Sequence, residues 1–223
     1  MFLSDRILSF LFQLRIPFRL PRGVDVLDAH KDPVVQEACT AFYRKFYADQ
    51  GSRTLLLGIN PGRFGGGVSG IPFTDPIRLQ ADCGIPNPFV KKQELSSVFI
   101  YEMIAAAGGP RDFYSRFYIS SMSPLGFVEQ GKNLNYYDHA LLLRRIRPFI
   151  ISCLRDQLSW GLNTATCFCI GEGENHRYLS ALNKELGFFK EIVALPHPRF
   201  VMQYRLRSKQ EYIDLYLGRL GLK

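Results

Sequence analysis

The segment Arg53-Thr-Leu-Leu-Leu-Gly-Ile59 constrains the fold of this chain more than any other feature of its sequence. Its three consecutive leucines do not alternate with polar residues, which is typical of a strand buried on both faces. Such strands occur in parallel sheets whose two faces are covered by helices. The short apolar segments 117–119, 165–170 and 191–195 are expected to be the other strands of this sheet.

Segments with helical periodicity lie between and around these strands. Apolar residues recur at helical spacing over 33–47, 98–107, 138–158, 175–186 and 209–220. Pro148 falls inside the third of these helices and should kink it or divide it in two. Strands that alternate with helices predict an α/β domain around a mostly parallel, four-stranded sheet. Ligands of such domains bind at the carboxyl ends of the strands, so a functional site is expected there.

The chain contains no internal repeat, low-complexity tract or linker, so a single domain over residues 1–223 is expected. Residues 1–30 are expected to form an N-terminal helical extension of it. Charged residues interrupt the apolar residues of this stretch, namely Asp5, Arg6, Arg15 and Arg19. This pattern is unlike a signal peptide or a membrane span and favours an amphipathic helix that packs on the domain.

The five cysteines give no sign of a disulfide framework or a metal site. Their number is odd and no two form a C-x-x-C pair. Cys167 and Cys169 alternate along an expected strand, so both should face the same side of the sheet and lie in the core. Unpaired cysteines fit a reducing cytoplasm, which is the expected location, and no metal is expected.

The net charge of the chain favours a polyanionic partner. Lysine and arginine number 28 against 20 aspartate and glutamate residues, which gives a formal charge of +8. Nucleic acid is the commonest partner of such a basic surface. The charge by itself leaves open that the domain is basic for no specific reason.

A glycine-rich segment follows the first strand and runs from Gly58 to Phe73. Glycine lets a ligand approach the main chain closely, which favours a binding loop over a flexible turn. Neither the phosphate-binding pattern G-x-x-x-x-G-K-[ST] nor a dinucleotide G-x-G-x-x-G stands at the end of the strand. The segment is therefore a candidate binding loop of a different kind, with Asn60 as its polar side chain.

Two other strand ends carry candidate side chains. His197 lies between two prolines just after the fourth strand, where a stiff backbone can aim a side chain. Ser120 and Ser121 end the strand at 117–119, although a simple capping turn also explains them. His30 is expected at the surface. These groups include no cysteine nucleophile, no paired carboxylates and no metal ligands, which argues against proteolysis, two-carboxylate glycoside hydrolysis and metal-assisted hydrolysis.

The combination of Gly58-Ile-Asn-Pro-Gly-Arg-Phe64, Gly70-Ile-Pro-Phe73 and His197-Pro resembles the uracil-DNA glycosylase superfamily. It is most similar to the single-strand-selective monofunctional branch (SMUG), in its second, bacterial subtype. The resemblance implies a three-layer α/β sandwich and a monomeric enzyme without cofactor. Such an enzyme flips a base out of DNA and hydrolyses its bond to deoxyribose, which begins base excision repair.

The resemblance also implies roles for individual residues. Asn60 would hold the attacking water, and His197 would donate a hydrogen bond to O2 of the departing base. Phe73 would stack on the flipped base. Gly62 falls where stricter relatives place a tyrosine that excludes bulk at the pyrimidine 5-position, and Gly66 would also line the substrate pocket.

The chain departs from the family pattern at two places. The second motif is usually His-Pro-Ser-Pro-Arg, whereas here the arginine follows directly after His197-Pro198. The base-reading asparagine of the parent branch aligns with Ser121, whose rotatable hydroxyl can donate or accept. This substitution favours a broader range of deaminated bases, with xanthine as a candidate.

The segment 200–209 is expected to be a DNA wedge, because apolar tips can replace a flipped base in the stack while basic side chains meet phosphates. The residues expected to contact DNA are Arg199, Phe200, Met202, Arg205 and Lys209. The alternative is the start of a basic helix with solvated arginines. For the whole chain, the alternatives are a non-catalytic nucleic-acid-binding module and a hydrolase of free nucleosides or nucleotides.

Overall fold

The computed structural model describes residues 1–222. Its centre is a sheet of four parallel strands in the order β3-β2-β6-β7. The strands are β2 (Thr54–Gly58), β3 (Phe117–Ser121), β6 (Asn163–Ile170) and β7 (Glu191–Leu195). The four strands expected from the sequence are thus confirmed, and the sheet is entirely parallel. Strand β2 lies between β3 and β6, and its residues Leu55, Leu56 and Leu57 are therefore completely buried.

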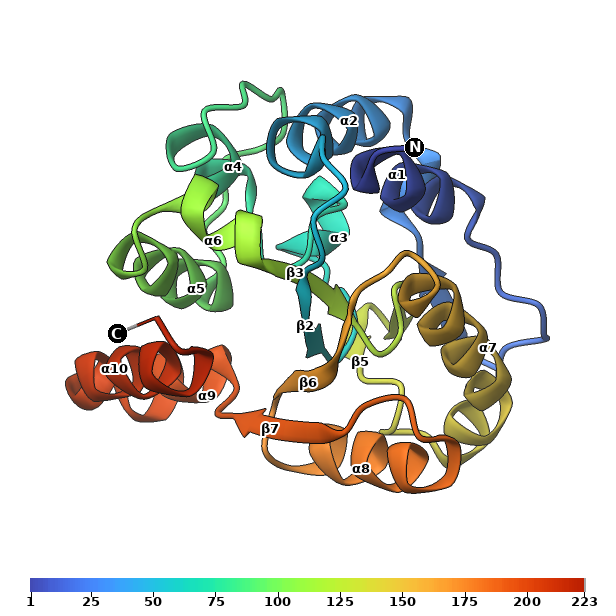
Figure 1. Cartoon of the computed structure of the whole chain (residues 1–223). Coiled ribbons are helices and arrows are strands. Elements are labelled where there is room, and N and C mark those ends of the chain that lie inside the picture. Colours follow the sequence, from blue (N-terminus) through green and yellow to red (C-terminus); the bar gives the residue numbers. More distant parts are fainter. Residues whose placement is uncertain (223) are drawn as a thin grey trace.

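Helices cover both faces of the sheet, which confirms the three-layer α/β sandwich (Figure 1). On one side lie α2 (Pro33–Tyr47), α5 (Leu95–Ala106), α6 (Pro110–Arg116) and α10 (Lys209–Leu220). On the other side lie α7 (Ala140–Leu158) and α8 (Glu174–Leu186). The chain runs from β2 to β3 through α5 and α6, then returns past β2 to β6 through α7. The strand order therefore reverses beside β2, which makes its carboxyl end a topological switch point.

A second, smaller sheet was not expected from the sequence. Its three antiparallel strands are ordered β1-β4-β5, with β1 (Val24–Leu27), β4 (Gly126–Glu129) and β5 (Lys132–Leu134). Gln130 and Gly131 join β4 to β5 and both have positive φ, at 48° and 71°. Two central residues with positive φ form the tight hairpin turn whose twist matches the flanking strands.

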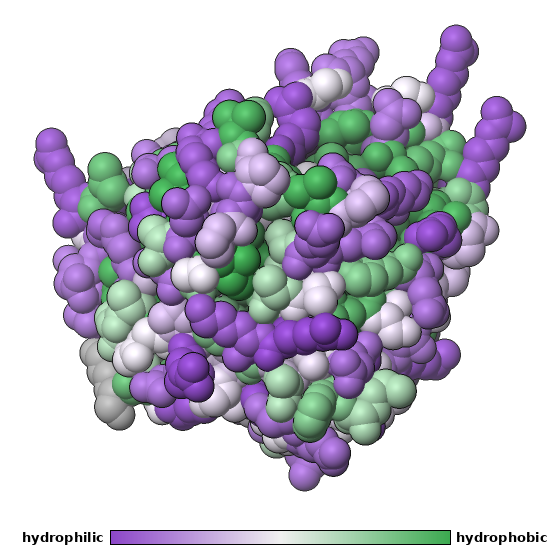
Figure 2. All heavy atoms as spheres, turned by 90° about the horizontal axis from the view of Figure 1, so that it is seen from above, coloured by the Kyte–Doolittle hydropathy of each residue, from purple (hydrophilic) through white to green (hydrophobic). Residues whose placement is uncertain are grey.

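The N-terminal region contains more than the helical extension that the sequence predicts. Helix α1 (Leu3–Gln13) packs on α2, but residues 24–27 form strand β1. Figure 2 shows the face on which α1, α2 and α4 (Pro76–Ala81) lie, where hydrophilic side chains cover most of the surface. None of the helices described over residues 1–222 combines the length and the apolar character of a membrane span.

One expectation, for His30, is corrected, and one of the two alternatives for Pro148 is excluded. His30 is not at the surface: it is 6% exposed, and its Nε2 lies 2.9 Å from the carbonyl oxygen of Gly70. Pro148 does not divide the helix, because α7 is continuous from Ala140 to Leu158. Pro148 and Arg144 both lie on the exposed side of α7. Water can therefore hydrate the Arg144 carbonyl that lacks its helical donor.

The remaining short helices are α3 (Gly66–Ser69), α9 (Pro198–Tyr204) and the 3₁₀ turns η1 (Ala29–Lys31) and η2 (Leu206–Ser208). Cys167 and Cys169 are completely buried, as expected for core residues on one side of β6.

Candidate active site

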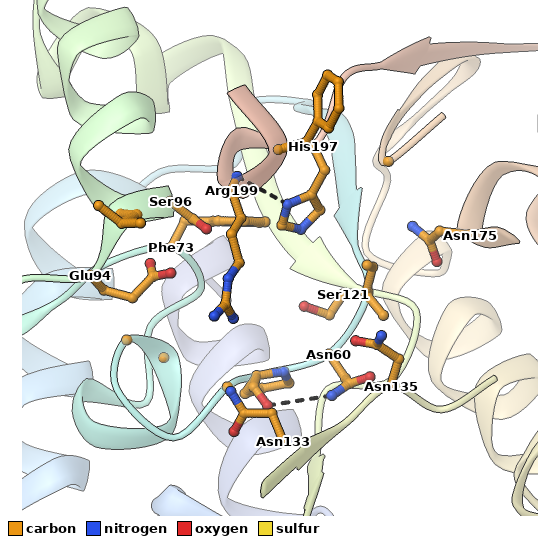
Figure 3. Close-up of a pocket in the computed structure, with 18 of the residues that line it drawn as sticks. Asn60, Phe73, Glu94, Ser96, Ser121, Asn133, Asn135, Asn175, His197 and Arg199 are labelled. Carbon is orange, nitrogen blue, oxygen red and sulfur yellow. Dashed lines mark hydrogen bonds between the residues drawn. The ribbon is translucent and has the colours of Figure 1, made fainter. Parts of the chain in front are cut away.

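A cleft of about 700 Å³ opens at the carboxyl ends of the four parallel strands. Residues that follow β2, β6 and β7 line it together with the end of β3, as expected at a topological switch point. Figure 3 shows Asn60, Phe73, Ser121 and His197 around this one space. The structure therefore brings together the candidate residues of three distant sequence segments.

Both ends of the Asn60 side-chain amide are held by the small second sheet. Asn60 Nδ2 donates to the Leu134 carbonyl oxygen at 3.2 Å, and Asn60 Oδ1 accepts from the Tyr136 backbone N–H at 3.0 Å. A flip of the amide would place donor against donor and acceptor against acceptor, so its orientation is fixed. Strand β5 and the residues after it thus present one defined amide face to the cleft.

The segment that holds Asn60 is itself anchored in the core. Tyr136 is completely buried, and its hydroxyl donates to Asn175 Oδ1 at 2.8 Å. Asn175 Nδ2 in turn donates to the Ile170 carbonyl oxygen at the end of β6. Gly126 permits the close approach of β4, since a Cβ there would lie 2.3 Å from the Pro61 carbonyl oxygen. The two sheets are thus tied together at the position of Asn60.

His197 presents a defined nitrogen to the cleft. It is the N-cap of α9, and its Nδ1 accepts from the Arg199 backbone N–H at 3.2 Å. Because Nδ1 is an acceptor, the neutral ring carries its proton on Nε2. Burial, together with the Arg199 charge, lowers the pKa of His197 to about 4. The side chain is therefore a neutral N–H donor near pH 7.

Phe73 is held in a strained conformation at the side of the cleft. Its φ is 53°, a left-handed value that is rare for a bulky residue and that concentrates at functional sites. Its ring packs against Gly58, where a Cβ would lie 2.8 Å from Phe73 Cε2. The Ser69 hydroxyl donates to the Thr74 carbonyl oxygen at 2.5 Å and fixes the turn that carries the ring. The ring centroids of Phe73 and His197 are 6.1 Å apart.

Gly62, Gly66 and Ser121 also line the cleft. A Cβ on Gly62 would lie 3.1 Å from Asn133 Nδ2, and one on Gly66 would lie 3.1 Å from the Ile71 carbonyl oxygen. Ser121 ends β3 opposite Gly58. Within residues 1–222 its hydroxyl makes no hydrogen bond to the protein, so it is free to bond an occupant of the cleft.

The segment after His197 is helical, with α9 over Pro198–Tyr204 followed by η2 and the start of α10. Arg199, Phe200 and Arg205 are exposed, and the Arg205 guanidinium lies 5.4 Å from the Phe200 ring centroid. Met202 instead packs against the hydrophobic core. Lys209 Nζ lies 2.5 Å from Glu102 Oε2, so its charge is already paired. Tyr204 and Leu206 are 67% and 57% exposed, and the Tyr204 ring centroid lies 5.8 Å from that of Phe200.

Several other residues that line the cleft were missed. Asn133 and Asn135 come from β5 and the residue after it, and Glu94 and Ser96 from the start of α5. No local motif marks them, since they reach the cleft only through the β4–β5 hairpin and the entry to α5. The Gln130-Gly131 pair was the available signal for that hairpin. Across residues 1–222, no three His, Cys, Asp or Glu side chains lie close enough to hold a metal ion.

Comparison with known proteins agrees with this geometry. The family profile described as the Uracil DNA glycosylase superfamily matches residues 44–221. The crystal structure of wild-type Pedobacter heparinus SMUG2 is 46% identical in sequence, with a TM-score of 0.97 over 99% of this chain and 97% of that chain. No curated protein sequence gives a match. The chain therefore belongs to the uracil DNA glycosylase superfamily, in its SMUG branch, and is a DNA glycosylase.

Proposed function

We propose that this enzyme removes uracil and related deaminated bases, xanthine among them, from DNA and so begins base excision repair. The observation that carries the proposal is the convergence of Asn60 and His197 on one cleft beside Phe73. Asn60 offers a fixed amide and His197 a neutral N–H donor. A protein that only bound nucleic acid would have no use for both.

In this proposal, the target nucleotide leaves the base stack and its base lies on the ring of Phe73. As the bond between C1′ and the base nitrogen breaks, its electron pair passes to the base and develops negative charge at O2. The Nε2–H of His197 donates to that oxygen, and a neutral donor needs no proton transfer to do so. A water held by Asn60 adds its oxygen to C1′ and releases a proton, and the base anion takes up a proton, which leaves an abasic deoxyribose and the free base.

Two features support a range of bases wider than uracil. The unpaired hydroxyl of Ser121 can donate or accept, so it does not demand the donor and acceptor pattern of a uracil edge. Gly62 has no side chain to restrict the base, and the Asn133 amide lies 3.1 Å from the place that a Cβ there would take. Xanthine, a larger deaminated base, is therefore a proposed substrate.

The exposed surface of α9 supports contact with DNA next to the flipped nucleotide. Phe200, Tyr204 and Leu206 are apolar tips that can fill the gap in the base stack. Arg199 and Arg205 stand beside them and can meet phosphates. All of these groups come from one chain, so we propose that the enzyme acts as a monomer.

The test uses an end-labelled oligonucleotide that contains one uracil, incubated with enzyme and then cleaved at abasic sites by alkali. Asn60→Ala and His197→Ala should each lower the single-turnover rate at least about tenfold, while binding to undamaged DNA changes little. Parallel substrates with xanthine, and free deoxyuridine, report the range of bases and the need for DNA. Wild-type rates in both variants would contradict the proposed site.

A further inference from the structure

The rim of the cleft opposite α9 carries a second group of aromatic and cationic side chains. We infer that Arg63, Phe64 and Lys92, here called the rim cluster, bind the DNA backbone on the side of the flipped nucleotide away from α9. The inference rests on the proposed function, because it places a DNA strand across the cleft. Neither the catalytic groups nor the α9 surface explains this cluster.

Contacts within the rim cluster hold two cations close together. Lys92 Nζ lies 3.9 Å from the centroid of the Phe64 ring, and the Arg63 guanidinium carbon lies 5.0 Å from it. These distances are within the range of cation–π attraction, which is strongest when water is partly excluded. Phe64 is 39% exposed and lines the cleft, so the cations stand at its edge.

The backbone of the cluster is fixed relative to Asn60. The Arg63 backbone N–H donates to Asn133 Oδ1 at 3.0 Å, and Asn133 belongs to β5, the strand whose end holds Asn60. In Figure 3, Asn133 lies on one side of the cleft and Arg199 enters from the other. The Arg63 backbone is therefore bound to the β5 side of the cleft, across from Arg199 of α9.

The charges of the cluster are free to bind an anion. Within residues 1–222, neither Arg63 nor Lys92 forms an ion pair, unlike Lys209, whose charge Glu102 neutralises. One oxygen of the nearby Glu94 carboxylate, Oε2, accepts from the backbone N–H and the hydroxyl of Ser97 at the start of α5. Two free cations on an aromatic scaffold match the phosphates of an extended strand.

A flipped nucleotide explains why two such surfaces are needed. Its own phosphate and those before and after it must pass over the cleft, so the strand enters at one rim and leaves at the other. The α9 surface, with Phe200 and Arg205, can bind the strand on only one side of the flipped nucleotide. The rim cluster is placed to bind the strand on the other side.

The experiment measures dissociation constants on a single-stranded, uracil-containing oligonucleotide as a function of salt, with Asn60→Ala in the background to slow excision of the base. Arg63→Gln and Lys92→Gln should each raise Kd about three- to tenfold at low salt and flatten the slope of log K against log salt by about 0.7. Phe64→Leu keeps both charges but removes the ring that orders them. It should raise Kd about two- to fivefold with little change of slope.

Arg147→Gln is the matched control. It removes one positive charge far from the cleft, where Arg147 is paired with Glu185 at the end of α8. This variant should keep the wild-type slope. If Arg63→Gln and Lys92→Gln behave like Arg147→Gln, the inference is overturned.

Oligonucleotides trimmed close to the uracil on its 5′ or its 3′ side test the placement. The effect of Lys92→Gln should disappear with one trimming and that of Arg205→Gln with the other. Loss of both effects with the same trimming would overturn the assignment to opposite sides. Uracil excision by the wild-type enzyme is measured separately, and Arg147→Gln should leave its single-turnover rate unchanged, so failure of this inference is distinguishable from absence of uracil excision.

Discussion

The hydrogen bonds that hold Asn60 make a specific prediction for Asn60→Asp. This change keeps the size of the side chain and the oxygen that accepts from the Tyr136 N–H. It replaces the donor Nδ2 by an oxygen that would face the Leu134 carbonyl oxygen at about the 3.2 Å of the present hydrogen bond. Two acceptors would then meet where a donor and an acceptor now pair.

The size of the effect follows from these contacts. A lost hydrogen bond costs about 1 kcal/mol, and an unpaired, partly buried acceptor adds about 1 to 2 kcal/mol. For a chain of this length, a loss of about 2 to 3 kcal/mol lowers Tm by about 4–12 °C. Protonation would restore a donor to Leu134, so the introduced carboxyl has a raised pKa in the folded protein. The deficit should therefore be complete near pH 8 and shrink as pH falls below about 6.

Thermal unfolding of the wild type and of Asn60→Asp, from pH 8 to below about pH 6, measures the loss of stability. Asn133→Asp is the matched control. Asn133 lies in the same cleft, but only its Oδ1 is engaged, as acceptor of the Arg63 N–H. Aspartate keeps that hydrogen bond, so the free energy of unfolding of Asn133→Asp should differ from the wild-type value by less than about 0.5 kcal/mol. An equal loss of Tm in Asn60→Asp and Asn133→Asp, or a loss for Asn60→Asp that does not depend on pH, would refute this reasoning. It would mean that Leu134 and Tyr136 do not hold the Asn60 amide in one orientation.

Three further predictions concern the substrate pocket and the histidine. Gly62→Tyr must displace the Asn133 amide, 3.1 Å from the new Cβ, before its ring reaches the pocket; excision of a 5-substituted uracil should fall more than that of uracil, and equal losses would indicate a disrupted loop. Ser121→Asn should preserve uracil excision and lower xanthine excision, measured on one preparation of known Tm, whereas a uniform loss at unchanged stability would count against a base-reading role. Because the pKa of His197 is lowered to about 4, the unfolded chain binds this proton first, and stability should fall as pH drops from about 6.5 to about 4. His197→Gln should lose less stability over that interval, with the buried His30, whose pKa is also lowered, contributing equally to both proteins; identical pH dependence would contradict the assignment.

Much of the central fold follows from local sequence patterns. The uninterrupted leucines of β2 and the helical periodicity of α2 and α10 each identify an element within a few residues, because burial on both faces or on one stripe leaves a regular pattern. The antiparallel sheet leaves a weaker pattern in the sequence. Strands β1 and β5 are four and three residues long, and β5 is largely exposed, so neither shows an apolar run. Their pairing depends on β4, about a hundred residues from β1.

The residues of the candidate site likewise fall into those that the sequence predicts and those that it does not. Asn60, Phe73 and His197 stand in motifs at strand ends, and strand ends meet in a parallel sheet, so their proximity was predictable. Asn133 and Asn135 were not, because they enter the cleft from the second sheet. Helix α9 also shows the limit of pattern reading. Its apolar and basic residues predicted exposed DNA contacts throughout, but helical geometry turns Met202 toward the core while Tyr204 remains outside.

Each of the three principal side chains is held by groups outside the strand that precedes it. Leu134 and Tyr136 orient Asn60, the Ser69 hydroxyl fixes the turn of Phe73, and the first turn of α9 sets the tautomer of His197. The motifs therefore contain the proposed reactive groups, whereas the geometry of these groups depends on residues that carry no motif. It follows that substitutions in the β4–β5 hairpin can change catalysis without touching the substrate, because that hairpin determines which face of the Asn60 amide meets the cleft.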